Sequence, residues 1–314
     1  MHANIGNPVT IRFALPAAEL RPYVTTFYRT EVSCSPAQPV LEDHLHPEWP
    51  NLRILAQGQA AAAVGSAPLS KSPLFAVTGP TSQATRFQVS SGCNWGIGLL
   101  PLGWAAFVDA EAGDYADRVV DGMADDAFAR FRPLVRDLLL AEGDFEAELA
   151  LIETHMARLA GQALKCDPSI KAINAALVDP EIASVGQLAE RVGMSVRSLE
   201  RLSRRAFGFA PKLLIRRQRF LRSLAQFMLD PSLKWLKALD CQYHDQAHFV
   251  RDFKRFMGMS PSAYARLDKP ILLAAARARM AIAGAAVQGL HDPGVPEFRL
   301  PGRKSRFKPN AALP

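Results

Sequence analysis

One sequence pattern occurs twice, 50 residues apart, in the most basic part of the chain. Residues 199–211 read LERLSRRAFGFAP and residues 249–261 read FVRDFKRFMGMSP. In both copies an Arg follows two places after an opening apolar residue, a Gly stands at the tenth place, and a Pro comes three places after that Gly. A helix that ends at Gly and a helix that begins at Pro satisfy backbone groups on both sides of the boundary. The pattern therefore predicts two similar helical units in tandem.

Charge is distributed unevenly along the 314 residues. Residues 1–169 carry 12 basic and 19 acidic side chains, residues 170–268 carry 17 and 9, and residues 269–314 carry 8 and 2. A basic surface that serves only solubility is one interpretation. Because the Arg and Lys here fall on patterned helix faces, binding to nucleic acid phosphate is favoured.

Other compositional features predict a cytoplasmic protein with no membrane partner. No run of 18 uncharged apolar residues is present, and the N-terminus lacks a basic start followed by an apolar core. The cysteines are scattered and never spaced as CxxC, which is typical of a reduced protein without structural zinc. They are Cys34, Cys93, Cys166 and Cys241.

The chain divides into three segments. Residues 1–165 begin with short apolar runs separated by Pro, Gly and Ser, which predicts a β-barrel or sandwich, and end with helical periodicity at about 116–163, which predicts a helix pair. Residues 166–268 are expected to be all helical. Residues 269–314 are expected to hold an Ala-rich helix over 270–290 and a basic, disordered tail. The fold class is thus α+β, with a barrel-like N-terminal domain before an all-α domain.

The first helical unit has the pattern of a helix-turn-helix. Ser184 and Gln187 form a capping box, Gly193 provides the turn, and a second helix spans 196–207 with a basic outer face. The second helix of this motif enters the major groove of DNA. Near its N-terminal half Arg197, Glu200 and Arg201 are expected to contact bases.

The second unit repeats this arrangement. Asp245 is the expected N-cap of a helix over 246–257, and its outward positions are expected to read bases. These positions are Gln246, Ala247, Val250 and Arg251. The helix between the two units, 211–229, would span about 27 Å and so could hold two reading helices in successive major grooves, about 34 Å apart. Phosphate contacts are assigned to Ser195, Arg204, Arg205, Lys212, Arg216, His248 and Lys254.

The segment YHDQAHFVRDFKRFMGMSPSAY resembles the signature of the AraC/XylS family of bacterial transcription regulators, and MSVRSLERLSRRAFGFAPK resembles the first recognition helix of that family. The resemblance covers about 170–267. It implies two helix-turn-helix motifs, sequence-specific binding to double-stranded promoter DNA, contact with RNA polymerase, and activation of transcription. It also implies a β-barrel sensor with a dimerising helix pair, and hence a homodimer.

The sequence departs from the family pattern just before the second motif. Lys237–Ala238 stands where an apolar–Ala pair is usual, and Gln242 stands where Gly is usual before Tyr243. A residue other than Gly in a left-handed turn costs roughly 1 kcal/mol. We therefore expect the second motif to hold DNA less firmly than the first, or in a shifted orientation.

The N-terminal half offers a candidate effector pocket, with Trp49, Trp95 and Trp104 as expected lining, although buried aromatic residues are also ordinary core. His44, His46 and Glu48 invite comparison with the metal ligands of cupins. In cupins three or four residues separate the second His from the Glu, whereas only Pro47 does so here. An ordinary loop with no metal and no cofactor is predicted.

Two alternatives to an effector-controlled regulator stay open at this point. The first is a metal-dependent cupin enzyme fused to a DNA-binding module. The second is a DNA-binding protein without a ligand, whose barrel is filled by side chains and serves only dimerisation. The favoured interpretation is a regulator that is not an enzyme.

Overall fold

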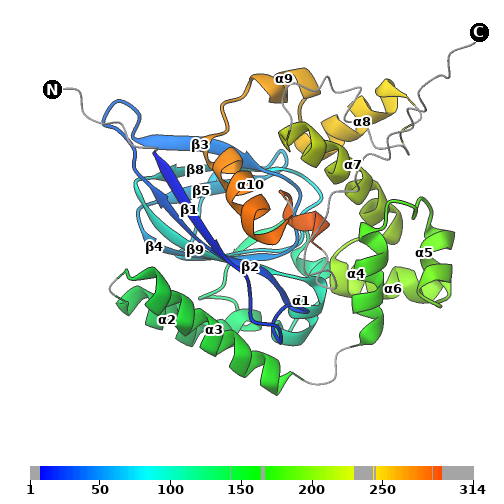
Figure 1. Ribbon diagram of the computed structural model, residues 1–314, viewed down its shortest axis with the longest axis horizontal. Coiled ribbons are helices and arrows are strands. Elements are labelled where there is room, and N and C mark those ends of the chain that lie inside the picture. The colour runs from blue at the N-terminus through cyan, green and yellow to red at the C-terminus, as the bar shows by residue number, and fades with distance from the viewer. Residues whose placement is uncertain are drawn as a thin grey trace, which may run out of the picture.

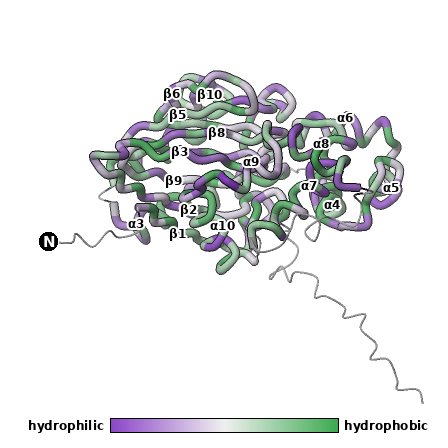
Figure 2. The backbone as a smooth tube through the Cα atoms, turned by 90° about the horizontal axis from the view of Figure 1, so that it is seen from above, coloured by the Kyte–Doolittle hydropathy of each residue, from purple (hydrophilic) through white to green (hydrophobic). Residues whose placement is uncertain are grey.

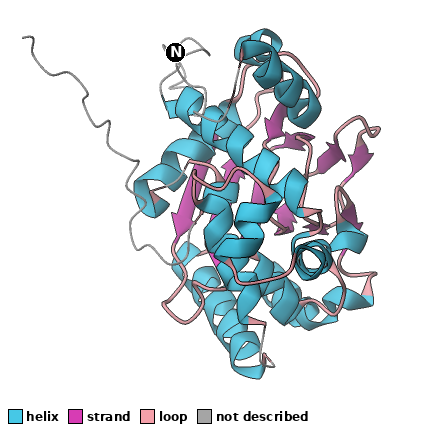
Figure 3. Cartoon of the chain, turned by 90° about the vertical axis from the view of Figure 1, so that its right-hand side faces the viewer, coloured by secondary structure: helices cyan, strands magenta, loops and turns pink. Residues whose placement is uncertain are grey.

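The computed structural model describes residues 8–141, 143–163, 167–229, 243, 245–284 and 286–291. A strand-rich half and a helical half lie side by side along the longest axis of the molecule (Figures 1 and 2). Seen from the helical end, the strands lie behind the helices (Figure 3). This is the architecture expected from the sequence, an antiparallel β domain followed by an α domain.

The strand-rich half consists of two antiparallel sheets that enclose a cavity. The six-stranded sheet has the order β1 (Val9–Ala14), β2 (Val24–Val32), β9 (Gly92–Leu99), β4 (Asn51–Gln57), β7 (Phe75–Thr78) and β10 (Val119–Asp121). The four-stranded sheet has the order β3 (Val40–Leu45), β8 (Thr85–Ser90), β5 (Ala60–Val64) and β6 (Ser70–Lys71).

The interior of this half is divided between a packed core and the cavity. Leu52, Ile54 and Ile97 of the central strands are at most 1% exposed and belong to the core. On the other face of the same sheet, Gly96 on β9 leaves room for the ring of Tyr28, where any Cβ would collide with that ring. A glycine is therefore required for Tyr28 to extend over the sheet, and the Tyr28 side chain lines the cavity.

Five helical elements follow or cross the sheets. They are α1 (Pro101–Phe107), η1 (Ala112–Tyr115), η2 (Asp126–Phe131), α2 (Arg132–Leu140) and α3 (Phe145–Gln162). Helices α2 and α3 form the expected helix pair and lie below the barrel in Figure 1. The pair begins at Arg132 rather than near residue 116, because residues 119–121 pair with β7 as strand β10. The Asp144 side chain caps α3 by accepting from the Ala147 amide, as acidic N-caps commonly do. Glu148 of α3 accepts from the Trp95 indole, which ties the pair to the sheet.

The helical half contains α4 (Pro168–Val178), α5 (Val185–Arg191), α6 (Val196–Phe207), α7 (Pro211–Leu229), α8 (Gln246–Met257) and α9 (Pro261–Arg266). Helix α7 is shared by two apolar clusters. Leu214 packs with α4–α6, and Phe220, Leu221 and Leu224 pack with α8 and α9. Helix α7 is thus the rod that fixes one helical unit relative to the other.

The chain then returns to the barrel through α10 (Pro270–Ala283) and η4 (Gln288–Leu290), which lie across the sheets in Figure 1. The Asp43 carboxylate on β3 accepts from the amides of Ile271 and Leu272 and so caps the first turn of α10. The helix ends at Gly284, which has φ 65°. It is therefore shorter than the Ala-rich helix over 270–290 that the sequence indicated.

By length and composition alone, residues 270–290 have the character of a membrane-crossing helix, with a mean hydropathy of 1.5. In the fold this segment is interrupted at Gly284 and packs against β1 and β3. It also buries Arg279 and Gln288, both 6% exposed. These are the features of a segment that packs on its own protein.

Buried contacts join the two halves. The Arg217 guanidinium on α7 lies 4.0 Å above the Trp49 ring and donates to the backbone carbonyls of Glu48 and Thr81. The Ala84 amide donates to the Phe256 carbonyl at 2.7 Å. The junction is continuous with the cores of both helical units, because Trp49 belongs to the first apolar cluster and Ala84 to the second.

His46 lies in this junction, with its Nε2 atom 2.8 Å from the Tyr264 hydroxyl of α9. Burial, together with the nearby charges of Lys269 and His44, lowers the pKa of His46 to about 3. The unfolded chain protonates this imidazole near pH 6.5, so in the window from pH 6.5 down to about 3 the unfolded state binds the extra proton. Stability from neutral His46 is thus complete above pH 6.5 and is lost as the pH falls through this window.

We predict that this junction weakens in acid. From pH 7 to pH 5 the His46 contribution to the free energy of unfolding should fall by about 2 kcal/mol. The difference between wild type and His46→Gln in denaturant titrations isolates it, since all other titrating groups are common to both proteins. A difference that stays constant between the two pH values would contradict the assignment.

Candidate DNA interface and ligand cavity

Helix α6 is held in position by its caps and its apolar face. The Ser195 hydroxyl accepts from the Ser198 amide at 3.2 Å and begins the helix. Gly193, with φ 65°, makes the turn from α5, and Gly208, with φ 82°, ends α6. Only a residue without a Cβ adopts these left-handed conformations at little cost. The turn and the recognition helix are thus set by the residues that the sequence pattern singled out.

The outer side of α6 bears the residues expected to read DNA. Arg197, Glu200, Arg201 and Arg204 are all exposed. Positions 197, 200, 201 and 204 follow one another at helical spacing and so share one face. This face combines guanidinium donors for guanine and phosphate with one carboxylate acceptor.

Arg205 points elsewhere. Its guanidinium lies 4.0 Å from the Asp167 carboxylate, and it lines a hollow between α6 and the N-terminal half that Glu111 and Arg130 also line. The phosphate contact expected of Arg205 therefore competes with acidic groups of the protein itself. Lys212, the first basic residue of α7, is exposed.

Helix α8 repeats the geometry of α6. The Asp245 carboxylate accepts from the His248 amide at 2.6 Å, and Gly258 ends the helix with φ 70°. Four of the expected contact residues are exposed and Val250 is half-buried. The exposed ones are Gln246, Ala247, Arg251 and Lys254.

A buried carboxylate organises the contact between α7 and α8. Asp252 is fully buried and accepts from Arg216 at 2.5 Å, from Arg219 at 3.1 Å and from the Tyr243 hydroxyl at 2.9 Å. Burial and the neighbouring Asp252 charge raise the pKa of Tyr243, so the phenol stays neutral and donates. His248 lies 3.2 Å from Arg219.

Two expected phosphate contacts are therefore placed differently by the structure. Arg216 is engaged by Asp252, and His248 is half-buried against Arg219 rather than free on the surface. Burial, and after it the charge of Arg219, lowers the pKa of His248 and keeps it neutral. The irregular segment before the second motif, with Lys237–Ala238 and Gln242, lies outside the described residues.

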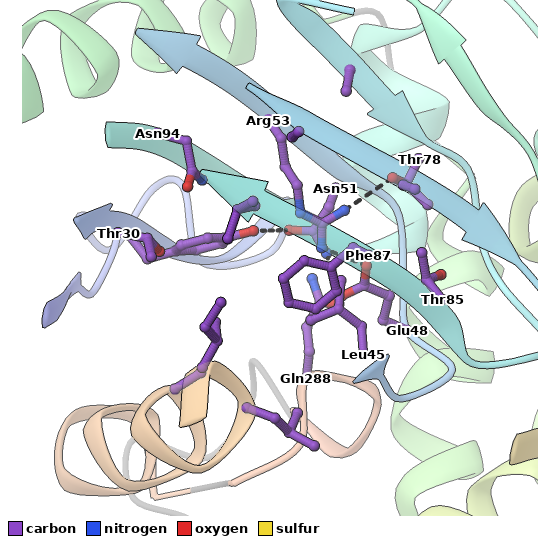
Figure 4. A pocket seen from close by; sticks show the side chains of 18 of the residues that line it. Thr30, Leu45, Glu48, Asn51, Arg53, Thr78, Thr85, Phe87, Asn94 and Gln288 are labelled. Atoms are coloured by element: carbon purple, nitrogen blue, oxygen red, sulfur yellow. Dashed lines mark hydrogen bonds and ion pairs between the residues drawn. The ribbon is translucent and has the colours of Figure 1, made fainter. Parts of the chain in front are cut away.

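A cavity of about 190 Å³ lies between the two sheets and α10 (Figure 4). This volume is more than ten times what one water molecule requires. Most of the wall is apolar, with contributions from both sheets and from the C-terminal segment. The apolar lining includes Ile11, Phe13, Val32, Leu45, Leu55, Phe87, Val89, Ile271, Leu272 and Val287.

One side of the cavity carries a polar network. Arg53 pairs with Glu48 at 2.5 Å and donates to Thr78 at 2.9 Å, and Asn51 donates to Glu48 at 2.9 Å and to Gln288 at 3.1 Å (Figure 4). The Tyr28 hydroxyl lies 3.2 Å from the Asn51 side-chain oxygen, and burial raises its pKa. The network therefore presents hydrogen-bonding groups to an otherwise apolar space, as small-molecule sites commonly do.

The tryptophans expected to line a pocket do not line this cavity. Trp95 and Trp104 are packed in the core of the N-terminal half, and Trp49 packs against Phe207 and Arg217 in the junction. The three indole rings are packed in the hydrophobic core instead, since each tryptophan is at most 1% exposed. The hollow that Trp104 does line lies outside the barrel, beside Arg205.

The His44, His46 and Glu48 set is also dispersed. Glu48 is engaged by Arg53 and Asn51, His46 faces Tyr264, and His44 is half-buried on β3. Among the residues that the structure describes, no three His, Cys, Asp or Glu side chains gather as a metal site would require.

Sequence reasoning missed the contributions of the C-terminal segment to the cavity. Arg279 and Gln288 both line it. A signal was available in the run LLAAARARMAIAG, where two Arg interrupt an Ala-rich helix. Arg277 is exposed and Arg279 is buried, so only the structure distinguishes them.

Comparison with known proteins agrees with this geometry. Residues 188–267 match the family model of a helix-turn-helix domain. These residues comprise α6 to α9, most of α5 and the exposed faces described above. The protein is a DNA-binding transcriptional regulator. Its helix-turn-helix domain is of the AraC type, as the sequence resemblance implied.

Solved structures similar to the chain share little sequence with it. ToxT from Vibrio cholerae is 9% identical, with 82% of this chain and 97% of that chain covered and a TM-score of 0.42. ToxT bound to (E)-4-(8-methylnaphthalen-1-yl)but-3-enoic acid is 12% identical, with coverage of 73% and 98% and a TM-score of 0.40. The AraC-like transcriptional activator CuxR is 13% identical, with coverage of 70% and 88% and a TM-score of 0.28. No curated protein matches the sequence.

The Asp252 cluster predicts a large effect of one substitution. Asp252→Ala should lower the free energy of unfolding by about 3–5 kcal/mol, because it leaves the two guanidiniums without their buried partner. Denaturant unfolding of the full chain measures it. Asp268→Ala, at an exposed position next to α10, is the control and should cost far less. Equal effects of the two changes would show that Asp252 does not organise the second unit.

Proposed function

We propose that this protein binds promoter DNA through both α6 and α8 in successive major grooves, and that a small molecule in the barrel cavity controls this binding. The observation that carries the first part is the pairing of two capped helices on one shared rod, α7, each with an exposed face of residues that are expected to read bases. Capping, apolar packing and the rod fix their spacing before DNA is met, so little ordering is needed on binding.

The cavity supports control by an effector. A barrel that serves only dimerisation would be filled by side chains, whereas this one encloses about 190 Å³ with an apolar wall and a polar network. The helical half contributes to its surroundings, because Gln218 on α7 donates to the Gly289 carbonyl at 2.6 Å and Gln288 lines the cavity. A ligand that shifts η4 would therefore act on α7 directly.

A cupin enzyme is the less favoured function. The residues that would hold its metal are committed elsewhere, His46 to Tyr264 and Glu48 to Arg53. We propose a cytoplasmic regulator that activates transcription through contact with RNA polymerase; this part rests on the AraC-type domain alone. Reporter transcription from a promoter that carries the selected site, with and without the protein, would distinguish activation from repression.

Base reading by α6 is tested by selection of random-sequence DNA with the full chain. Arg201→Ala should cost about 1–3 kcal/mol at one base pair and relax the preference there. Arg204→Ala should weaken binding to all sequences alike and reduce the salt dependence by about one phosphate contact. Arg86→Ala, at an exposed position on β8, is the control. A preference unchanged by Arg201→Ala would remove base reading from this residue.

We further propose that the protein is a homodimer and that the helix pair α2–α3 forms the interface between its subunits. Leu140 is 82% exposed, Leu139 39% and Leu151 38%, so the pair presents large apolar side chains to solvent. Leu140→Asp combined with Leu151→Asp should convert a dimer to a monomer in sedimentation equilibrium. Leu74→Asp, at an exposed leucine outside the pair, should leave the dimer intact. A wild-type protein that sediments as a monomer would contradict the proposal.

A further inference from the structure

Arg279 of α10 is a buried cation at the cavity wall. It is 6% exposed and lines the cavity, and its Cζ atom lies 5.1 Å from the centre of the Phe13 ring. One terminal nitrogen, Nη2, donates to the Thr26 hydroxyl at 2.7 Å. The other, Nη1, is buried and has no hydrogen-bond partner in the described structure. A guanidinium offers five N–H donors in a rigid fork, so Arg279 has donors left for a ligand.

The charges that line the cavity do not balance. Among the residues that the structure describes, two guanidiniums of the lining, of Arg53 and Arg279, face a single carboxylate, that of Glu48, and Glu48 is already paired with Arg53. His46, the other basic group of the lining, is neutral at physiological pH because its pKa is lowered to about 3 by burial. An unpaired charge in an apolar enclosure is unfavourable, and burial lowers the pKa of Arg279 to about 10.

Such a charge is relieved by a ligand of opposite sign. A carboxylate matches the guanidinium fork, and hydrogen bonds between these two ions are about twice as strong as those between neutral groups. The remaining wall is apolar, so the rest of the ligand must be apolar as well. The charge and the wall together define a small organic acid with an apolar body.

We propose that the barrel cavity binds an apolar organic carboxylate and that Arg279 of the C-terminal helix holds its carboxylate group. This inference rests on the proposed effector control and names the chemical class of the effector. It also assigns recognition to a helix that lies beyond the helix-turn-helix domain and whose N-terminus is capped by Asp43 of the barrel.

The position of Arg279 gives the ligand a route to the DNA-binding half. Helix α10 is bound to the barrel through Asp43, and η4 is bound to Asn51 and Thr25 of the barrel and to Gln218 of α7. A carboxylate bound to Arg279 therefore contacts a segment that is hydrogen-bonded to both the barrel and α7.

Titration calorimetry of the full chain tests the proposal with benzoate, 4-phenylbutanoate and octanoate, each beside its neutral primary amide. At least one acid should bind, and at least about tenfold more tightly than its amide. This comparison in the wild type depends on no substitution. Absence of binding by all three acids, or equal binding of acid and amide, would overturn the proposal.

Substitutions then locate the carboxylate. Arg279→Met should weaken binding of the acid at least about tenfold and leave binding of the amide unchanged, and Arg279→Lys should retain part of the preference for the acid. Arg277→Met, on the exposed side of the same helix, should change neither. Thermal unfolding without ligand shows whether Arg279 serves ligand binding or the stability of the fold. Arg279→Met should melt no lower than wild type if the charge is uncompensated, and undiminished acid binding by this variant would overturn the assignment.

DNA affinity distinguishes this inference from the proposed function on which it rests. If the acid binds as expected and changes DNA affinity, both stand. If the acid binds and DNA affinity is unchanged, the carboxylate site stands and effector control fails. If DNA affinity responds to the amide as strongly as to the acid, effector control stands and the carboxylate site fails.

Discussion

The structure depends on one buried contact between its halves, the Arg217 guanidinium against the Trp49 ring. Arg217 is fully buried, donates to two backbone carbonyls, and stacks 4.0 Å from an indole that is itself fully buried. No carboxylate of the described part of the chain forms an ion pair with Arg217, so its burial is costly and lowers its pKa to about 9. Arg217 joins the rod between the two reading helices to the loop that enters the barrel wall.

A consequence of this junction is that the cavity and the helices α6 and α8 belong to one packed body. Trp49 extends the core of the first helical unit into the barrel, while α10 and η4 return from beyond the second unit to cover the cavity. A molecule in the cavity therefore meets side chains from both halves, Arg53 and Asn51 from the sheets and Arg279 and Gln288 from the C-terminal segment. A ligand changes an equilibrium only through contacts that differ between two states, and a ligand in this cavity would contact residues of both halves.

The sequence predicted those features that residues close together in the chain determine. Capping residues, glycines after the last turn and prolines at the next start located the helices around both motifs, because such signals act over three or four residues. The cavity was not predictable in this way. Trp49, Trp95 and Trp104 became core because burial of large rings dominates packing, and Arg216 became the partner of Asp252 through a contact 36 residues away in the chain. Arg277 and Arg279 are indistinguishable by sequence and opposite in burial, since only the docking of α10 decides which side faces the barrel.

The most direct test of two reading helices fixed on one rod is a hydroxyl-radical footprint of the full chain on its selected DNA site. The structure predicts protection on one face of the duplex at two successive major grooves, one helical turn apart. Protection at the groove assigned to α6 should weaken when Arg201 is replaced by Ala, and protection at the other groove should weaken less. Protection of a single groove, or of the whole duplex without a pattern, would contradict the central claim that both units engage DNA together.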